Sequence, residues 1–365
     1  MKLEELDLYL TNRCNLSCDF CSVEARKNCE ELSFDRIKEL VTEAKEYGLE
    51  ELHLTGGEPT LRNDLEQIVS FAVALGLNVR LITNGTTLTR ERLVKLQNNG
   101  LHSIMISLDG EQEYHDRVRG SGAYAKTLQT IQIALELGFF VRVNSVAWQD
   151  NRSEIIRLAH KLNEMGVFVY SVFLGSPLGY AQSHMDNVIT PYEWRQFYTE
   201  LKAIATMQEY NTKIVVEKGF LFPDESEFDT TILSGRGRGC HNITDYYDFL
   251  LIRSNGDMYP CVFFSNEATP IGNVNNASIG DILQSYAQNE FYCQVGQYPK
   301  PCAECSNLRH CKGGCRGYTK LYTGDWFGGD PRCQGNGSDI FPLCPIVKYN
   351  LNEGIIGGSS EQVLK

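Results

Sequence analysis

The sequence predicts an α/β protein in which strands and helices alternate around a parallel sheet. Three observations support this class: short apolar segments with strand character recur between residues 4 and 175, segments with helical periodicity separate them, and turns containing Gly or Asn follow most of them. Six such strands imply either an open doubly wound sheet or a partial (β/α)6 barrel. In both folds the functional residues gather at the C-terminal ends of the strands.

Strands and helices are expected to alternate without interruption in this region. Strands are expected at 4–10, 51–56, 78–83, 103–110, 140–147 and 168–175, and helices at 33–48 and near 64–75, 89–99, 123–137 and 153–165. The first helix illustrates the signals, because Ser33 is a suitable N-cap and Gly48 lies just past the last turn. One more helix, at 191–210, is expected inside a connection that spans 183–235.

The composition is that of an ordinary globular protein. The chain has 365 residues, of which 42% are hydrophobic and 22% charged, and this length suits about two domains. Its formal net charge of −12 argues against nucleic acid as the main partner, because phosphate binding favours a basic surface. No apolar run reaches the ~18 residues of a membrane span, and no signal peptide precedes the first strand. A cytoplasmic location is therefore expected.

The thirteen cysteines occur in two groups. Cys14, Cys18, Cys21 and Cys29 lie near the start, no cysteine lies between 30 and 239, and nine follow from Cys240 onward. A reducing compartment disfavours disulfides, so metal binding is the better explanation for both groups.

The first three cysteines have the spacing C-x3-C-x2-C, in CNLSCDFC at 14–21. A structural zinc site or an ordinary four-iron cluster takes four protein ligands, so one coordination position is left for something other than the protein. Further motifs follow the later strands: GGEP at 56–59, TNG at 83–85, SLDG at 107–110 and GSPLGYA at 175–181. Each alone is common in turns. A zinc site that lacks one ligand is the structural alternative.

Together, CNLSCDFC and GGEP resemble the radical S-adenosylmethionine (SAM) superfamily, over a core of residues 1–182. The resemblance implies a partial (β/α)6 TIM-like barrel in which Cys14, Cys18 and Cys21 hold three irons of a [4Fe–4S] cluster. It also implies that SAM takes the fourth iron and is cleaved by one electron to methionine and a 5′-deoxyadenosyl radical.

The same resemblance implies roles for residues that contact SAM. Phe20 would lie beside the adenine, and Gly56, Gly57 and Glu58 would receive the methionine amino group, with the carboxylate as its charge partner. Three further residues would lie near the ribose end of SAM: Ser107, Asp109 and, as a weaker candidate, Asn144. Turn capping is the alternative explanation for Ser107 and Asp109.

The second cysteine group resembles the SPASM domain, which carries two auxiliary [4Fe–4S] clusters in many members of the superfamily. It covers about 236–350 and leaves a tail at 351–365. The resemblance assigns Cys302, Cys305, Cys311 and Cys333 to the outer cluster, and Cys240, Cys261 and Cys315 to the inner one. The alternative is a zinc module at 302–315 with His310 as a spare ligand.

The inner cluster has three cysteines in this pattern where four are expected. Cys29, Cys293 or Cys344 could supply the fourth ligand, or the iron could be open to substrate. Each of these cysteines is equally explained as a plain buried thiol. No catalytic base is identified.

SPASM-containing members mostly modify ribosomally made peptides, so the resemblance implies a precursor peptide substrate and a C–C crosslink, a C–S crosslink or a backbone excision. A haem-biosynthetic enzyme is the first alternative, because GGDPRC at 328–333 resembles such members. A sulfatase-maturing enzyme is weaker, since Val262 stands where those typically have Asp. A non-catalytic iron–sulfur or zinc scaffold protein would not need the GGEP loop.

Two partners besides the peptide are expected. One is an electron donor such as a flavodoxin or a ferredoxin. The other is a separate leader-recognition protein, because the first strand begins within four residues of Met1.

Overall fold

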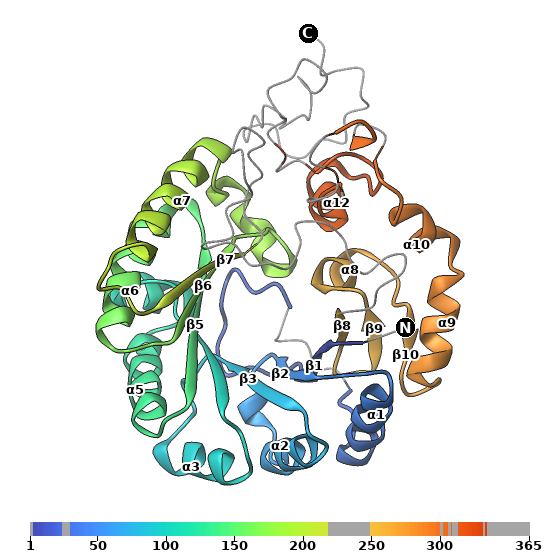
Figure 1. Cartoon of the computed structure of the whole chain (residues 1–365), viewed down its shortest axis with the longest axis horizontal. Helices are drawn as coiled ribbons and strands as arrows, with labels where there is room; N and C mark the ends of the chain where they lie inside the picture. The colour runs from blue at the N-terminus through green and yellow to red at the C-terminus, as the bar shows by residue number, and fades with distance from the viewer. Residues whose placement is uncertain are drawn as a thin grey trace.

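The computed structural model describes residues 3–23, 30–217, 249–299, 302–305, 308, 313–330 and 333. Within these ranges the strands form one ten-stranded sheet in the order β10-β9-β8-β1-β2-β3-β4-β5-β6-β7. The sheet curves into an open arc with helices on its convex side (Figure 1). The predicted α/β class is confirmed, and of the two predicted architectures the curved sheet is the partial barrel.

Eight of the strands in the described ranges run parallel, as expected for strands that a helix returns to the same end of the sheet. These strands are β1 (Glu5–Thr11), β2 (Glu51–Gly56), β3 (Asn78–Thr83), β4 (Ser103–Ser107), β5 (Phe140–Ala147), β6 (Val169–Leu174), β7 (Lys213–Glu217) and β8 (Phe249–Ile252).

The helices of the barrel pack one apolar stripe against the sheet. In the first helix Ile37, Leu40, Val41 and Ala44 are buried, and the Ser33 hydroxyl caps the helix by accepting a hydrogen bond from the Arg36 N–H. The barrel helices are α1 (Phe34–Glu46), α2 (Leu65–Ala74), α3 (Arg90–Asn98), α4 (Gln112–Arg119), α5 (Ala123–Glu136), α6 (Arg152–Glu164) and α7 (Pro191–Ala205), with short 3₁₀ turns η1 (Pro59–Leu61), η2 (Gln149–Asn151) and η3 (Gly179–Asn187). None of the helices in the described ranges has the length and apolar character to cross a membrane.

Two elements of the barrel were not predicted from the sequence. The helix α4 is short and mostly polar, so it lacks a clear periodic stripe. The strand β7 lies inside the segment 183–235, which was expected to hold only a helix and a connection, and it pairs with β6 at the edge of the sheet. The barrel therefore contains a seventh strand, and the connection is not purely helical.

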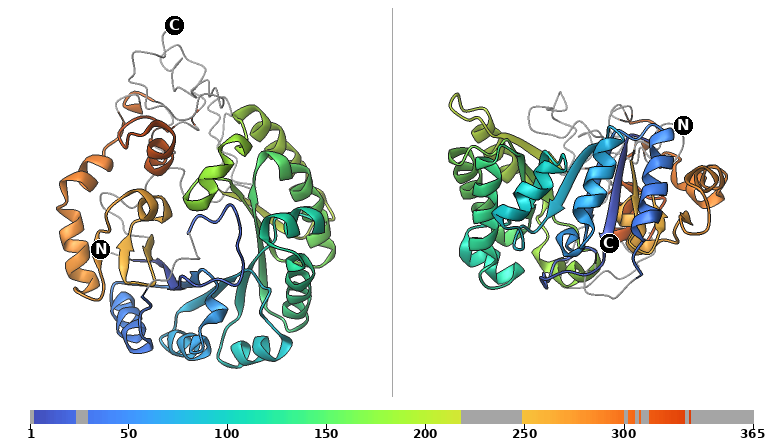
Figure 2. Two further views of the ribbon diagram at one scale, coloured as in Figure 1. Left: turned by 180° about the vertical axis from the view of Figure 1, so that it is seen from behind. Right: turned by 90° about the horizontal axis from the view of Figure 1, so that it is seen from below.

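The cysteine-rich C-terminal segment continues the same sheet. The strand β8 pairs with β1 on the side opposite β2, and β9 (Asp257–Tyr259) and β10 (Gly272–Asn273) follow in antiparallel pairing. Both views in Figure 2 show this segment beside the barrel strands at one end of the arc. Its helices are α8 (Val262–Glu267), α9 (Ile279–Ala287), α10 (Glu290–Val295) and α12 (Arg316–Thr323).

The two faces of the central strands differ sharply in polarity, because successive side chains of a strand point to opposite faces. On β1 the buried Leu6 and Leu8 belong to the helix-covered apolar core. On the other face, Asp7 Oδ1 lies 2.9 Å from Nδ1 of His53 on β2, and Nη1 of Arg80 on β3 lies 2.7 Å from the other ring nitrogen of that histidine. The concave face of the barrel is therefore polar near the N-terminal ends of its strands.

Candidate functional site

The first cysteine motif follows β1, at the edge where the C-terminal ends of the parallel strands meet. Figure 1 shows that the segment after β1 extends into the space enclosed by the arc. The side chains of Cys14, Cys18 and Cys21 are all partly buried. The fold thus brings the three predicted iron ligands to the end of the barrel where active sites of this architecture lie.

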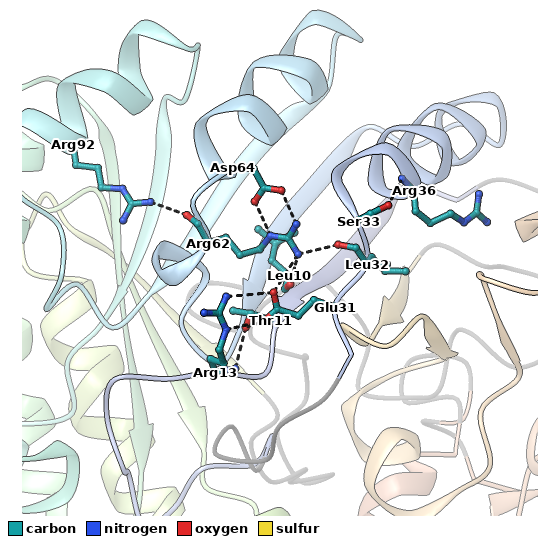
Figure 3. Close-up of polar contacts among 10 residues, drawn as sticks. All are labelled: Leu10, Thr11, Arg13, Glu31, Leu32, Ser33, Arg36, Arg62, Asp64 and Arg92. Carbon is teal, nitrogen blue, oxygen red and sulfur yellow. Dashed lines mark hydrogen bonds and ion pairs between the residues drawn. The ribbon is translucent and has the colours of Figure 1, made fainter.

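A buried arginine joins the two ends of the cysteine loop (Figure 3). Nη1 of Arg62 donates hydrogen bonds of 3.0 Å to the carbonyl oxygens of both Leu10, on β1, and Leu32, just before α1. Asp64 holds the other side of the guanidinium at 2.7 and 2.8 Å. Because one fork-shaped cation binds both carbonyls, the entry and the return of the loop are fixed relative to each other.

Two more contacts hold the loop in place. Glu31 accepts hydrogen bonds from the Thr11 hydroxyl and from Nε of Arg13 at 2.9 Å (Figure 3). Farther along, the carbonyl of Cys21 accepts a 3.0 Å hydrogen bond from the N–H of Tyr180, in the turn after β6. The backbone of the third cysteine is therefore hydrogen-bonded to the turn that follows β6.

Gly56 and Gly57 lie directly against the backbone that precedes Cys14. A Cβ atom on Gly57 would lie 2.3 Å from the carbonyl oxygen of Arg13, and one on Gly56 would lie 2.4 Å from that of Thr11. Gly56 also has a φ of +130°, which side chains rarely adopt. The glycines thus let the GGEP loop pack against the cysteine loop, backbone to backbone.

The Glu58 carboxylate is fully buried and is surrounded by donors of the protein. One oxygen accepts from the Thr60 N–H and hydroxyl at 3.1 and 2.5 Å and from the Thr83 hydroxyl at 2.7 Å, and the other accepts from the Asn84 N–H at 2.9 Å. Burial raises the pKa of Glu58, while these hydrogen bonds oppose the shift. The geometry indicates a carboxylate that joins the ends of β2 and β3.

Replacing Glu58 with Gln is expected to destabilise the protein by about 1–3 kcal/mol. The side-chain NH₂ group of Gln would replace one carboxylate oxygen and would point at a protein N–H or O–H donor, so a buried hydrogen bond would be lost. SAM affinity should fall as a consequence of the disturbed loop. Thermal unfolding and SAM binding by calorimetry measure the two effects. Glu66→Gln, at a half-buried pair with Arg92, is the matched control and should cost at most about 1 kcal/mol. Unchanged stability with a ten- to hundredfold loss of affinity would instead indicate direct contact of the carboxylate with SAM.

The sulfur of Cys14 has two N–H donors nearby. The Leu16 N–H lies 3.5 Å away, and Nδ2 of Asn84, in the TNG motif, lies 3.9 Å away. The orientation of the Asn84 amide is fixed because its oxygen accepts from the Thr86 N–H at 2.9 Å. Sequence reasoning noticed TNG as a turn but did not include Asn84 in the site.

The candidates on β4 and β5 and just after β4 fall into two groups. The Ser107 hydroxyl lies 3.4 Å from the amide oxygen of Asn144, so the sheet register brings these two side chains together. Asp109 is completely buried, and its oxygens accept from the Val146 N–H at 2.9 Å and from Nε of Arg119 at 2.5 Å. Its carboxylate is therefore bound to the protein on both sides.

Phe20 lies in a small buried cluster at the same end of the barrel. Its ring centroid is 6.4 Å from that of Trp148 and 6.5 Å from that of His184, and the Arg119 guanidinium lies 5.4 Å from it. Sequence reasoning missed Arg119 and Trp148. The only local signal for Arg119 is its place at the end of a polar helix ten residues after Asp109.

The charges around the three thiols suit an anionic metal cluster. Burial raises the pKa of the Cys14 thiol to about 11. Burial also raises the pKa of the Cys18 thiol, and the positive charge of nearby Arg119 offsets only part of this shift. A metal ligand must be the thiolate, so bound iron would supply the positive charge that these buried sulfurs need. Three partly buried cysteines, N–H donors at one sulfur and a guanidinium near another fit an iron–sulfur cluster.

The C-terminal cysteines are only partly within the described ranges. Five cysteines there have partly buried side chains: Cys261, Cys302, Cys305, Cys315 and Cys333. Cys240, Cys311 and Cys344, like Cys29 near the start of the chain, lie outside the described residues. Asp330 joins two of the segments, since Oδ2 accepts from the Cys315 N–H at 2.6 Å and its carbonyl accepts from the Cys333 N–H at 2.9 Å. Cys293 is exposed on α10 and donates to the Ala287 carbonyl.

Two family models match the chain. Residues 8–162 match the Radical SAM superfamily, and residues 240–306 match SPASM, an iron-sulfur cluster-binding domain. The matches cover the barrel as far as α6 and the first part of the cysteine-rich segment.

Characterised relatives cover most of the chain. The PqqA peptide cyclase of Rhodopseudomonas palustris is 30% identical, over 89% of this chain and 85% of the relative. The AdoMet-dependent heme synthase of Methanosarcina barkeri is 28% identical, over 89% of this chain and 94% of the relative. The crystal structure of Streptococcus suis SuiB bound to precursor peptide SuiA has a TM-score of 0.75 at 21% identity, and the similarity covers 92% of this chain and 76% of SuiB.

Proposed function

This chain belongs to the radical SAM superfamily and carries a SPASM domain, and we propose that it uses reductive cleavage of SAM to modify a ribosomally made precursor peptide. The 30% identity to a PqqA peptide cyclase, which extends over the barrel and the cysteine-rich segment alike, carries this proposal. The fold shared with SuiB, whose structure holds a precursor peptide, is consistent with it.

We assign Cys14, Cys18 and Cys21 as the ligands of the catalytic cluster. When bound, the cluster supplies the electron that cleaves SAM. The protein contributes the anchoring described above: Arg62 fixes the ends of the loop, and the Tyr180 N–H holds the backbone of Cys21. These contacts keep the thiols inside the arc.

We assign the SAM contacts to side chains at the ends of the strands. Ser107 and Asn144 would offer a hydroxyl and an amide to the ribose, and Phe20 would lie beside the adenine. The SAM carboxylate would meet Arg119, a guanidinium whose side chain is only 10% exposed. Glu58 and Asp109 would act by positioning, because both carboxylates already bind donors of the protein.

The cysteine-rich segment would hold two auxiliary clusters, which makes three [4Fe–4S] clusters in all. The proposed outer ligands are Cys302, Cys305, Cys311 and Cys333, and the proposed inner ligands are Cys240, Cys261 and Cys315. The exposed Cys293 is a poor candidate for a fourth inner ligand, since its thiol donates to the carbonyl of Ala287 at the end of α9. An electron donor such as a flavodoxin or ferredoxin would be required.

A haem-biosynthetic reaction is the second candidate. The heme synthase relative matches 94% of its own length, and GGDPRC at 328–333 places Asp330 where it bonds the segments of Cys315 and Cys333. Both candidates share the SAM chemistry and differ in the substrate.

One experiment separates the candidates. The protein is purified without oxygen, supplied with SAM and dithionite, and incubated either with a candidate precursor peptide, sought as a short open reading frame next to its gene, or with a haem-precursor porphyrin. We expect 5′-deoxyadenosine together with a change in peptide mass, namely a loss of hydrogen for a crosslink or of a fragment for an excision. Conversion of the porphyrin with an unchanged peptide would overturn the peptide proposal.

A further inference from the structure

Arg253 contacts both cysteine-bearing segments of the molecule. It follows β8 directly, and its Nη1 donates a 3.2 Å hydrogen bond to the carbonyl of Val23, two residues after Cys21. Its Nη2 donates to the hydroxyl and the carbonyl of Ser265 on α8, at 2.7 and 3.4 Å. The N–H of Ser265 in turn donates to the carbonyl of Cys261 at 3.1 Å. One side chain therefore spans from the catalytic loop to the first turn after an auxiliary cysteine.

The side chain of Tyr9 lies beneath this guanidinium. The register pairs Leu8 of β1 with Ile252 of β8, so Tyr9 and Arg253 are neighbours, and the guanidinium lies 5.3 Å from the centre of the tyrosine ring. Burial raises the pKa of Tyr9, the arginine lowers it, and Asp7 and then the thiols of Cys21 and Cys261 raise it further. Both thiols are thus close to the same side chain.

Among the residues that the structure describes, no carboxylate forms an ion pair with Arg253, although Asp7 and Asp257 lie near the tyrosines that surround it. Its contacts there are carbonyl oxygens, one hydroxyl and an aromatic face. A guanidinium stays protonated at any pH the protein tolerates. A fixed positive charge therefore lies between two segments that carry thiols.

We propose that Arg253 is a positioning residue that couples the catalytic and the inner auxiliary iron–sulfur sites. It holds the backbone after Cys21 and the start of α8 at a fixed spacing, and it provides one positive charge to both sites. The inference rests on the proposed function only in that both cysteine groups hold clusters. Nearby positive charge stabilises the reduced, more negative form of a cluster, so Arg253 should raise the reduction potentials of both sites.

The test compares Arg253→Met, Arg253→Gln and Arg253→Lys with Arg36→Met in the cluster-loaded protein. Arg36 is a matched control, because it also joins the barrel to the C-terminal segment: its Nε donates to the Val274 carbonyl at 3.0 Å, while its Nη1 forms an ion pair with Glu39 at 2.9 Å. Midpoint potentials come from titrations followed by electron paramagnetic resonance, without peptide, and stability comes from thermal unfolding.

We expect the Met and Gln variants to shift the potentials of the catalytic and one auxiliary cluster to more negative values. The Lys variant keeps the positive charge but cannot form the hydrogen bonds of both guanidinium nitrogens. Its cluster reduction potentials should therefore match the wild type, while its unfolding temperature falls. Arg36→Met should lower the unfolding temperature without moving any potential.

Three results would overturn the inference: wild-type potentials in the Met and Gln variants, a shift in Lys as large as in Met, or an equal shift in Arg36→Met. If Arg253→Met does not assemble clusters, the reduction potentials of Arg253→Gln and Arg253→Lys are compared instead. The potentials are measured without peptide. A failure to modify the peptide in the functional assay would therefore not change the result of this test.

Discussion

Changing Cys14, Cys18 and Cys21 together to Ala is expected to abolish SAM cleavage entirely. The three proposed [4Fe–4S] clusters would correspond to about twelve irons per chain, and the triple variant should lose four of them. The auxiliary clusters should remain, because their proposed ligands lie in a different segment. Iron analysis and the yield of 5′-deoxyadenosine measure the two effects.

Cys293→Ala is the control for this experiment. The thiol is exposed on α10 and is not assigned to any cluster, so this variant should keep its iron and its activity. The assignment of the catalytic cluster fails if the triple variant still produces 5′-deoxyadenosine. Loss of one auxiliary cluster in Cys293→Ala would identify the missing fourth inner ligand.

Replacing Gly57 with Ala is expected to have the second largest effect. The new methyl group would lie 2.3 Å from the oxygen and 2.7 Å from the carbon of the Arg13 carbonyl, both of which are backbone atoms. The loop cannot simply move away, because the Gly57 N–H donates to Thr11 and the Glu58 N–H donates to Arg13, each at 2.8 Å. The segment next to Cys14 must shift instead. We expect a loss of about 3 kcal/mol or more in stability, at the upper end for overpacking.

We expect Gly57→Ala to bind the iron of the catalytic cluster incompletely or not at all. Thermal unfolding and iron content after reconstitution measure it. Gly76→Ala is the matched control: its φ of +74° costs about 1–2 kcal/mol, but the new methyl group meets nothing within 4 Å. Gly76→Ala should therefore retain its iron. Wild-type stability and iron content in Gly57→Ala would show that the two loops are not packed as described.

The sequence alone was enough to predict the repeating strands and helices of the barrel. The expected strands 78–83 and 140–147 coincide with β3 and β5, because alternating apolar residues and flanking turns are properties of neighbours along the chain. The cysteine spacing and the GGEP loop were likewise sufficient to indicate the family. Both the short α4 and the edge strand β7 were missed, since neither has a long periodic pattern.

Only the tertiary structure decided what each polar side chain contacts. Glu58 has the donors of Thr83 and Asn84 around it because parallel pairing places the ends of β2 and β3 side by side. Arg253 reaches Val23, 230 positions earlier in the chain, because β8 pairs with β1 and so brings the auxiliary segment beside the catalytic loop. Such contacts depend on sheet order and register across distant segments, whereas local periodicity specifies only which segments become strands and helices.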